Sequence, residues 1–588
     1  MAEKIHKTPS AVNGKKDFSV VSGHESAGGS SERRGREPLS PPMPRRVCLP
    51  DFSGRTLTLP DGPESWQCRG EGPDALVLGL GPGSPWLTGL VGKARRVCWL
   101  EHEPTLRALP PLESRGGTGL PEHWQRVSPE EAAALAVRST CYFYGPAMRL
   151  APEFWGPLMG RVDAALLHAP CPDMAAEPAV METSGVRRGD GIREGGPVLL
   201  PGHSGLLLHQ ELHQALEECG LGPVLPMPEK AHGPVERASL HHIFRQRRPR
   251  FLLSVNLRGL DAEGRVFHLC RAMGVPVVLW LVDNPWHVLS ALRLPWWREA
   301  FIFVTDASFV PELAGAGARQ VFHLPLAVPR HMWRSTRPGH ARGGAEMEPL
   351  FVGRSAFPHK GRFFAAARVP DALGEEALRV LERSRGPMDA PNYFWWQERL
   401  GAAVWPGMAS RDAGLGAEIC AQANRARWLR AVVDQAATQK NDACVRPALR
   451  IVGDAGWHEL LPGAQILPPV DYYMVLPDLY ASAAVLNVTS LLLPRSLSQR
   501  HFDVWAAGGV LFSDATPGLD IFPTSLTEPI RLRGPEDFWS RWDEACSRPA
   551  QMAELRRAWR EHLRSAHDYE HRVRRICEIA GIGCPASG

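Results

Sequence analysis

The chain has 588 residues, more than one hydrophobic core normally serves, so two or three domains are expected. Its formal net charge of +4 is small, which argues against a dedicated nucleic-acid-binding protein with a concentrated basic stripe. The twelve cysteines include no Cys-x-x-Cys pair, so neither a zinc site nor a dithiol redox site is indicated, and a reducing compartment fits best.

Signals for membrane insertion or secretion are missing from the sequence. No run approaches the roughly 20 apolar residues that a membrane-spanning helix needs. The N-terminus also lacks the apolar core of a signal peptide. We therefore expect a cytoplasmic protein with no transmembrane segment, for which contact with a membrane would be peripheral.

The first part of the chain divides into a tail and an α/β domain. Residues 1–45 carry Lys, Ser, Gly, Pro and Arg with few large apolar side chains, which predicts a disordered tail. Ordered structure is expected from residue 46, and residues 46–195 are predicted to form a Rossmann-like N-terminal domain. The apolar run Ala164–His168 is interpreted as one of its strands.

A possible nucleotide-binding unit opens this domain. The buried strand Ala75–Leu80 leads into the glycine-rich turn Gly79–Gly83, and a second strand, Val97–Leu100, ends on Glu101. Such glycines let the backbone approach a ligand, and the carboxylate can take ribose hydroxyls, as in a dinucleotide or S-adenosylmethionine pocket. Because a bare Gly-x-Gly-x-Gly is weak evidence, a degenerate domain without ligand is the favoured interpretation and a working methyltransferase the alternative.

The middle of the chain alternates apolar strands with helical or polar spacers. This alternation predicts crossover units and a mostly parallel sheet, and we expect one complete doubly wound domain over residues 196–342. Its six predicted strands are Val198–Pro201, Pro223–Pro226, Phe251–Val255, Val275–Val282, Ala300–Thr305 and Gln320–Leu324.

A third series of the same kind occupies residues 343–588. A long helical insertion, residues 371–438, separates its first two strands, and the tail has helical periodicity over residues 549–579. Its predicted strands are Pro349–Val352, Leu449–Val452, Gln465–Leu467, Ala484–Asn487, Val510–Ser513 and Pro529–Leu532. The predicted fold class is α/β, with two doubly wound domains preceded by an additional Rossmann-like domain.

The most informative motif is His501–Pro523. Asp503 begins a short helix, Gly508 and Gly509 end it and permit a tight turn into a buried strand, and Asp514 follows that strand. Ligands of open α/β sheets bind at the carboxyl ends of the strands, and a helix N-terminus can present amides to a phosphate while a carboxylate binds ribose. An ordinary helix–turn–strand with a glycine cap explains the same pattern, and the residues alone leave both interpretations open.

The same motif resembles the acidic-x-x-Ala-x-Gly segment, with its following strand and Pro-Gly-Leu, of two-domain glycosyltransferases of the GT-B fold. The resemblance implies two facing Rossmann-like domains that close over a nucleotide-diphosphate sugar. Asp503 stands where the family usually has a Glu that holds the nucleotide ribose. Many retaining members have a second Glu where this chain has Arg495, which puts the sugar-side contact of that pair in doubt.

Further segments agree with the family. Phe351–Arg354, followed by Lys360, is similar to the first strand and loop of its nucleotide-binding domain, where Arg and Lys neutralise the diphosphate; a surface loop with two cations is the alternative. Val485–Thr489 is similar to the strand before the acidic motif. Together these resemblances imply a donor-binding set consisting of Gly353, Arg354, Lys360, Asn487, Asp503, Gly508, Gly509 and Asp514.

The spore-maturation (CgeB-type) glycosyltransferases are the most similar subgroup. Three stretches carry this resemblance, which spans about residues 196–580: Trp280–Pro285, Phe303–Asp306 with Val321–Ala327, and His567–Arg572. It implies a bacterial-type enzyme that moves a sugar from a nucleotide-sugar to a protein or surface-glycan acceptor. Because no Asp-x-Asp motif stands in a suitable place, no metal is predicted.

Two carboxylates are candidates for the chemistry. Asp283 ends a very apolar strand and would serve as a base or orient the acceptor hydroxyl; Asp306 ends the next strand and is second, with a helix-capping role favoured for it. Two functions from other classes remain open: an S-adenosylmethionine-dependent methyltransferase using the N-terminal domain, and a glycan- or nucleotide-binding scaffold without turnover.

Overall fold

The structure is a computed structural model. It describes residues 46–82, 85–92, 94–110, 120–168, 195–227, 234–334, 347–401, 403–438 and 446–585. The predicted tail at residues 1–45 and Gly83 of the glycine-rich turn lie outside these ranges. Residues 46–588 group as one compact unit.

The front sheet lies in the segment that the sequence assigns to the N-terminal domain. It has five strands in the order β3-β7-β4-β5-β6, in which β3 is antiparallel to β7 and the other neighbours are parallel. The predicted strands appear as β4 and β5. The strands are β3 (Trp66–Arg69), β4 (Asp74–Leu78), β5 (Val97–Leu100), β6 (Gln125–Arg126) and β7 (Ser139–Tyr144), with β1 (Cys48–Pro50) and β2 (Thr56–Thr58) as a separate pair.

One predicted strand of this segment is wrong. Ala164–His168 is the end of helix α5 (Pro152–His168), because buried side chains recur at helical spacing from Trp155 onward and continue through Val162. A five-residue apolar run carries too little periodicity to distinguish the two structures. Helix α5 packs against α8 (Arg265–Ala272), and the approach is so close that a Cβ on Gly160 would lie 2.3 Å from the carbonyl oxygen of His268. The other helices here are α1 (Pro85–Val91), α2 (Glu103–Ala108), α3 (Pro129–Leu135) and α4 (Ala147–Leu150).

The middle sheet has six parallel strands in the order β13-β12-β11-β10-β8-β9. All six were predicted, and the order reverses direction between β8 and β10, which makes this the topological switch point. The strands are β8 (Val198–Leu199), β9 (Val224–Leu225), β10 (Phe251–Val255), β11 (Val277–Leu281), β12 (Phe301–Val304) and β13 (Gln320–His323). Besides α8, the helices are α6 (His209–Glu218), α7 (Pro234–Gln246), α9 (Pro285–Leu289) and α10 (Phe309–Gly315).

The C-terminal sheet is also six-stranded and parallel, in the order β16-β15-β14-β17-β18-β19, with its switch point between β14 and β17. The strands are β14 (Glu348–Val352), β15 (Arg450–Val452), β16 (Gln465–Leu467), β17 (Ala483–Asn487), β18 (Val510–Asp514) and β19 (Arg531–Leu532). The predicted fold class is thereby confirmed: two doubly wound α/β sheets follow an additional α/β sheet. Each sheet falls within one predicted domain, whereas the domain boundaries themselves remain predictions.

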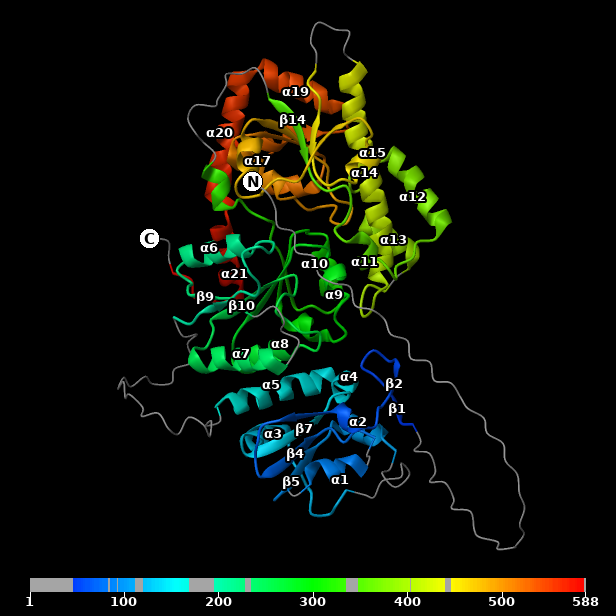
Figure 1. Cartoon of the computed structure of the whole chain (residues 1–588), viewed down its shortest axis with the longest axis vertical. Helices are drawn as coiled ribbons and strands as arrows, with labels where there is room; N and C mark the ends of the chain where they lie inside the picture. The colour runs from blue at the N-terminus through cyan, green and yellow to red at the C-terminus, as the bar shows by residue number, and fades with distance from the viewer. Residues whose placement is uncertain are drawn as a thin grey trace, which may run out of the picture. The chain divides into compact units, whose positions relative to one another are not determined.

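Long helices accompany the C-terminal sheet (Figure 1). The described residues of the predicted helical insertion form three helices, of which α14 packs its buried Trp428, Leu429 and Val432 into the same core as β14. The last helix, α21, packs Tyr569 and Ile576 into the core of the middle sheet. The helices are α11 (Lys360–Phe363), α12 (Asp371–Arg383), α13 (Tyr393–Leu400), α14 (Ser410–Thr438), α15 (Trp457–Leu460), α16 (Leu476–Ala481), α17 (Arg500–Ala507), α18 (Thr524–Thr527), α19 (Asp537–Ser547), α20 (Pro549–Ala566) and α21 (Tyr569–Ala580).

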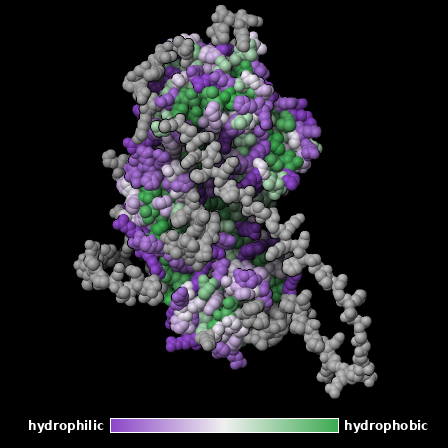
Figure 2. Space-filling model, viewed as in Figure 1, coloured by the Kyte–Doolittle hydropathy of each residue, from purple (hydrophilic) through white to green (hydrophobic). Residues whose placement is uncertain are grey.

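The surface mixes polar and apolar residues. On the face shown in Figure 2, hydrophilic residues are interspersed with smaller apolar areas. Large apolar side chains that are exposed include Met474, which is 78% exposed, and its neighbour Val475. Within the described ranges, no helix is both long and apolar enough to cross a membrane.

Candidate functional site

Arg500 lies at the switch point of the C-terminal sheet. Strand β14 ends at Val352 and β17 at Asn487, so a ligand of this sheet is expected beside these two strand ends. Arg500, the first residue of α17, donates from Nη1 to the carbonyl oxygen of Val352 (2.6 Å) and from Nε to Oδ1 of Asn487 (3.0 Å). The guanidinium therefore spans the two strands at the position where the topology predicts a ligand.

The guanidinium of Arg500 keeps binding capacity. The residue is half-buried, and burial lowers its pKa, with the nearby cation of Arg425 adding to the effect. Neither hydrogen bond involves Nη2, so within the described part of the chain that end of the side chain stays available to an anion. An arginine fork in a partly desolvated position binds phosphate oxygens strongly, because its hydrogen bonds are charge-assisted.

The segment that follows β14 contains three predicted residues. Gly353 is fixed on both sides, because its N–H donates to the Val452 carbonyl (3.0 Å) and its carbonyl accepts from Nε1 of Trp457 (2.9 Å). Arg354 is exposed. Lys360 is half-buried and donates from Nζ to Oε1 of Gln422 (3.0 Å), so it is held against α14. The two predicted cations thus lie in different surroundings, and only Arg354 reaches freely into solvent.

Asp503 is at the predicted place in the first turn of α17, but its carboxylate is closed off. It is 1% exposed, and its two oxygens accept hydrogen bonds from the Tyr472 hydroxyl (2.9 Å) and from Nε2 of Gln499 (2.7 Å). Burial raises its pKa to about 8. Gln499 in turn accepts a hydrogen bond from the Tyr569 hydroxyl (3.1 Å). A ribose could reach this carboxylate only by replacing one of its present partners.

Asn487 and Asp514 belong to a buried network at the ends of β17 and β18. Asn487 donates to the Ser513 hydroxyl (3.1 Å), while Asp514 accepts from the backbone N–H (2.9 Å) and hydroxyl (2.7 Å) of Thr489. Burial raises the pKa of Asp514 to about 6. These bonds hold the two strand ends together, which supports the position of Arg500.

The two glycines after α17 have separate structural roles. Gly508 ends the helix with φ of 96°, a conformation that favours glycine. Gly509 must lack a side chain, because a Cβ there would lie 2.2 Å from the carbonyl oxygen of Tyr480. The pattern predicted the turn correctly; neither glycine contacts Arg500.

Asp283 follows β11 at the corresponding edge of the middle sheet. It is exposed, and Oδ2 accepts a hydrogen bond from Nδ2 of Asn256 (2.7 Å). Asn256 has a φ of 51°, and its side-chain oxygen accepts a hydrogen bond from the N–H of Val282 (3.0 Å). This bond holds the Asn256 side chain in the position from which it orients the carboxylate. The protein packed around Asp283 raises its pKa, while Asn256 and Arg258 oppose the increase. A held carboxylate of raised pKa at a strand end suits acid–base work.

Asp306 has a different environment. It is fully buried and accepts the N–H of Ser308 (2.8 Å) and the N–H of Arg495 (2.8 Å). The second bond joins the middle sheet to the loop before α17, where the sequence departs from the usual Glu of the family. Both carboxylate oxygens are thus engaged, and the geometry assigns Asp306 to connecting the two segments.

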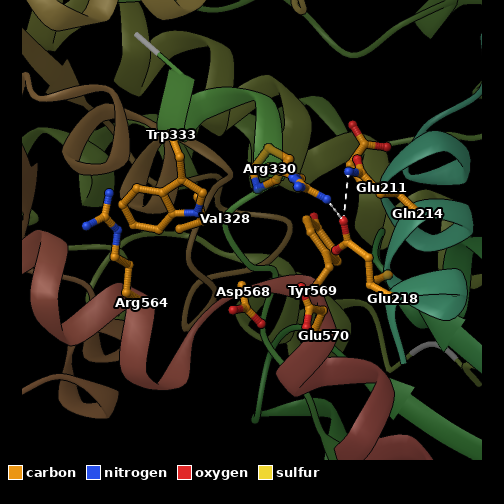
Figure 3. Close-up of a pocket in the computed structure, with 12 residues that line it drawn as sticks. Glu211, Gln214, Glu218, Val328, Arg330, Trp333, Arg564, Asp568, Tyr569 and Glu570 are labelled. Atoms are coloured by element: carbon orange, nitrogen blue, oxygen red, sulfur yellow. Dashed lines mark hydrogen bonds and ion pairs between the residues drawn. The ribbon is translucent and has the colours of Figure 1, made fainter. Parts of the chain in front are cut away.

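A separate pocket lies where the chain passes between the middle and C-terminal sheets (Figure 3). We call it the linker pocket. Its walls come from α6, from the linker Val328–Trp333 and from residues 564–570 at the junction of α20 and α21. It is not lined by the strand-end residues predicted from the sequence.

Groups of the protein contact the glycine-rich turn of the front sheet where a cofactor would bind. Glu101 is 3% exposed and accepts the N–H of Leu80 (2.7 Å), and a Cβ on Gly79 or Gly81 would lie 3.1 or 3.0 Å from the side chain of Tyr144. The carboxylate and the glycines that would bind a cofactor therefore contact the loop and a tyrosine side chain. This arrangement does not favour the methyltransferase alternative.

Residues 425–578, which contain Arg500, Asp503 and Asp514, match the model of the family described as Glycosyl transferase-like. This part of the chain is similar to that family. The match supports glycosyl transfer in general and leaves the acceptor open. No curated protein matches the sequence.

Two solved structures have weak similarity to the chain. One is described as T4 phage BGT in complex with UDP and Mn2+, and the other as the DNA-modifying enzyme beta-glucosyltransferase in the presence and absence of uridine diphosphoglucose. Both have 9% sequence identity and a TM-score of 0.34; each match covers 65% of this chain, and 99% and 98% of the respective structure. Similarity at this level supports no conclusion about the activity of this chain.

Sequence reasoning missed the arginine and the aromatic partner of the site. Arg500 was overlooked although it stands three residues before Asp503, at the start of the predicted helix and beside two predicted strand ends. Tyr472 gave no comparable signal, because it follows β16 in a loop and reaches Asp503 only through the tertiary fold.

Proposed function

We propose that the chain is a glycosyltransferase that moves a sugar from a nucleotide-sugar to a protein or surface-glycan acceptor. The observation that carries this proposal is Arg500, whose guanidinium spans the ends of β14 and β17 at the switch point of the glycosyltransferase-like segment. A departing nucleoside diphosphate gains negative charge, and a preorganised guanidinium would stabilise it.

The other residues take roles around that cation. We assign the diphosphate to Arg500, with Arg354 and the loop after Gly353 beside it. Asp503 would bind the ribose: a ribose hydroxyl would replace the Tyr472 hydroxyl as the donor to its carboxylate. Because this carboxylate is buried, the new hydrogen bond would form away from bulk water. Asn487, Gly508, Gly509 and Asp514 support this edge, and Lys360 fixes the loop to α14.

The acceptor would bind against the middle sheet. Asp283 is the proposed base, because Asn256 holds its carboxylate at the strand end and the raised pKa favours proton uptake. Asp306 would tie the two segments together. We further propose a bacterial, cytoplasmic protein of the CgeB type that works without a metal.

A binding screen tests the donor assignment. Purified protein is titrated with UDP, GDP, dTDP, CDP and their sugars by thermal shift and calorimetry. The test variant is Arg500→Lys, which keeps the charge and loses the fork, and the matched control is Arg450→Lys at the opposite, amino-terminal edge of the same sheet. We expect one nucleotide class to bind the wild type and the control, and to bind the test variant at least about tenfold more weakly.

Two outcomes would overturn the assignment. Equal binding to all three proteins would place the donor elsewhere. Binding of S-adenosylmethionine in place of any nucleotide would transfer the activity to the front sheet, against the arrangement of Glu101.

A further inference from the structure

The linker pocket has the dimensions of a ligand site. Its volume is about 760 Å³, within the range that small-molecule sites occupy. Three separate stretches of chain build it, so it is formed by the tertiary fold and not by a single loop. Figure 3 shows Trp333 and Arg564 on one side, Arg330 and Glu218 opposite them, and Asp568 and Glu570 between.

One wall combines an aromatic ring with a cation. Trp333 is half-buried, and the guanidinium carbon of Arg564 lies 4.8 Å from the centre of its ring. Arg564 is itself exposed, and Arg560 also lies near the ring, 5.5 Å from its centre, so a ligand can contact the Arg564 guanidinium and the part of the indole that the two arginines leave open. Aromatic rings next to planar polar groups bind ligands that have both apolar C–H faces and hydroxyl groups.

The opposite wall offers fixed hydrogen-bonding groups. Glu218 forms an ion pair with Arg330 and accepts a hydrogen bond from Nε2 of Gln214 (3.1 Å), so these side chains are held in place. The other carboxylate oxygen of Glu218 and the remaining N–H groups of Arg330 can bind hydroxyl groups of a ligand with little further loss of conformational freedom.

A buried acceptor without a partner lines the same pocket. Glu211 is 7% exposed; one carboxylate oxygen accepts from the Tyr473 hydroxyl (3.0 Å), and the other, Oε2, has no hydrogen-bond partner among the described residues. An unsatisfied buried acceptor is unfavourable and requires an explanation. A ligand that donates a hydroxyl or ammonium hydrogen would satisfy this oxygen.

The charge of the pocket limits the ligand class. Four carboxyl groups (Glu211, Glu218, Asp568 and Glu570) line it against two guanidinium groups, Arg330 and Arg564. Burial raises the pKa of Glu211, but the other three carboxylates still outnumber the two guanidinium groups. Phosphate and other anions would be repelled by this excess, so a second nucleotide is disfavoured. Neutral hydroxyl-rich ligands fit, as do those that carry an amine.

We propose that the linker pocket is a saccharide-binding site, lined by residues other than those assigned to the donor, that takes a neutral or amine-bearing sugar. The ligand would contact the Trp333 ring and exchange hydrogen bonds with Arg564, Glu570 and the carboxylates opposite. This proposal rests on the walls of the pocket and holds whether or not the chain transfers sugars.

Calorimetry with free sugars tests it. Wild-type protein is titrated with D-glucose, D-galactose, N-acetyl-D-glucosamine, D-glucosamine and chitobiose, with glucose 1-phosphate as the anionic comparison. We expect saturable binding of at least one uncharged or amine-bearing sugar at about 1 mM or tighter, and weaker binding of the phosphate ester. Stronger binding of the neutral sugars than of D-glucosamine would identify hydroxyl recognition; the reverse would identify amine recognition.

Variants assign the binding to this pocket. Arg564→Ala and Glu570→Gln change partly exposed side chains and should each weaken sugar binding at least about tenfold. Arg557→Ala, an exposed arginine on the same helix outside the pocket, should leave it unchanged. The proposal is overturned if none of these sugars binds, if both pocket variants bind like the wild type, or if glucose 1-phosphate binds most tightly. Titration of the same variants with UDP separates this result from the donor assignment.

Discussion

His287 provides a prediction whose magnitude can be worked out from burial. It lies on α9 and is 4% exposed, with aromatic rings from the C-terminal segment around it: Phe357, Phe363, Phe364 and Tyr393, at centroid distances from 5.4 to 6.3 Å. Its Nε2 has no hydrogen-bond partner among the described residues. Removal from water disfavours the imidazolium and lowers the pKa of His287 to about 3.

The sign of the effect on stability is set by linkage. The pKa is about 6.5 in the unfolded chain and lower in the folded one, so unfolding takes up a proton below that pH. Stability is therefore lost as the pH falls from about 6.5 towards 3. At pH 5 the difference of about 1.5 pH units corresponds to about 2 kcal/mol, and at pH 7.5 the contribution is close to zero.

The substitution His287→Leu removes the titrating group. Its effect on packing is the same at every pH. The difference in the free energy of unfolding between variant and wild type therefore changes with pH only through the titration of His287. Urea unfolding at pH 7.5 and 5.0, followed by tryptophan fluorescence, should show the variant gaining about 2 kcal/mol relative to wild type on acidification. His287→Phe, which also removes the imidazole, should show the same change with pH. Identical pH dependence of His287→Leu and wild type would refute burial of this ring between the two segments.

Three further predictions concern the proposed site. Tyr472→Phe removes the hydroxyl that occupies Asp503, so the donor nucleotide should bind about tenfold more tightly in calorimetry; unchanged or weaker binding would show that ribose does not replace Tyr472. Gly509→Ala places a methyl group 2.2 Å from the Tyr480 carbonyl and should lower the free energy of unfolding by at least about 2 kcal/mol in urea, whereas wild-type stability would contradict the close approach. Asp283→Asn should abolish sugar transfer while nucleotide affinity stays at the wild-type value, and retained transfer would remove Asp283 as the base.

The central strands of both doubly wound sheets could be predicted because parallel strands covered on both faces are continuous apolar runs. Phe251–Val255 and Gln465–Leu467 have the predicted bounds, and β19 begins two residues late because a 3-10 turn takes up Glu528–Ile530. Ala164–His168 was misassigned for the opposite reason: it is the last part of a helix that has apolar residues on its buried side, and the run by itself has no detectable period.

The location of the candidate site could be predicted from the sequence, whereas the contacts of its side chains could not. Strand ends and the helix after β17 can be inferred from alternation, which placed Asn487, Asp503 and Asp514 at one edge of the sheet. The side chains that donate hydrogen bonds to these carboxylates come from loops distant in sequence: Tyr472 donates to Asp503, and Thr489 donates to Asp514. The linker pocket was beyond prediction for the same reason, since its walls come from three separate stretches of chain.

Release of nucleoside diphosphate tests the proposed glycosyl transfer most directly. The protein is incubated with each nucleotide-sugar that binds, together with a pool of saccharide and protein acceptors, and the diphosphate released is measured over time. The account predicts release from one donor class, at least about tenfold slower in Arg500→Lys and unchanged in Arg450→Lys. Binding without release from any donor would contradict transfer and would leave a nucleotide-binding scaffold as the function of this chain.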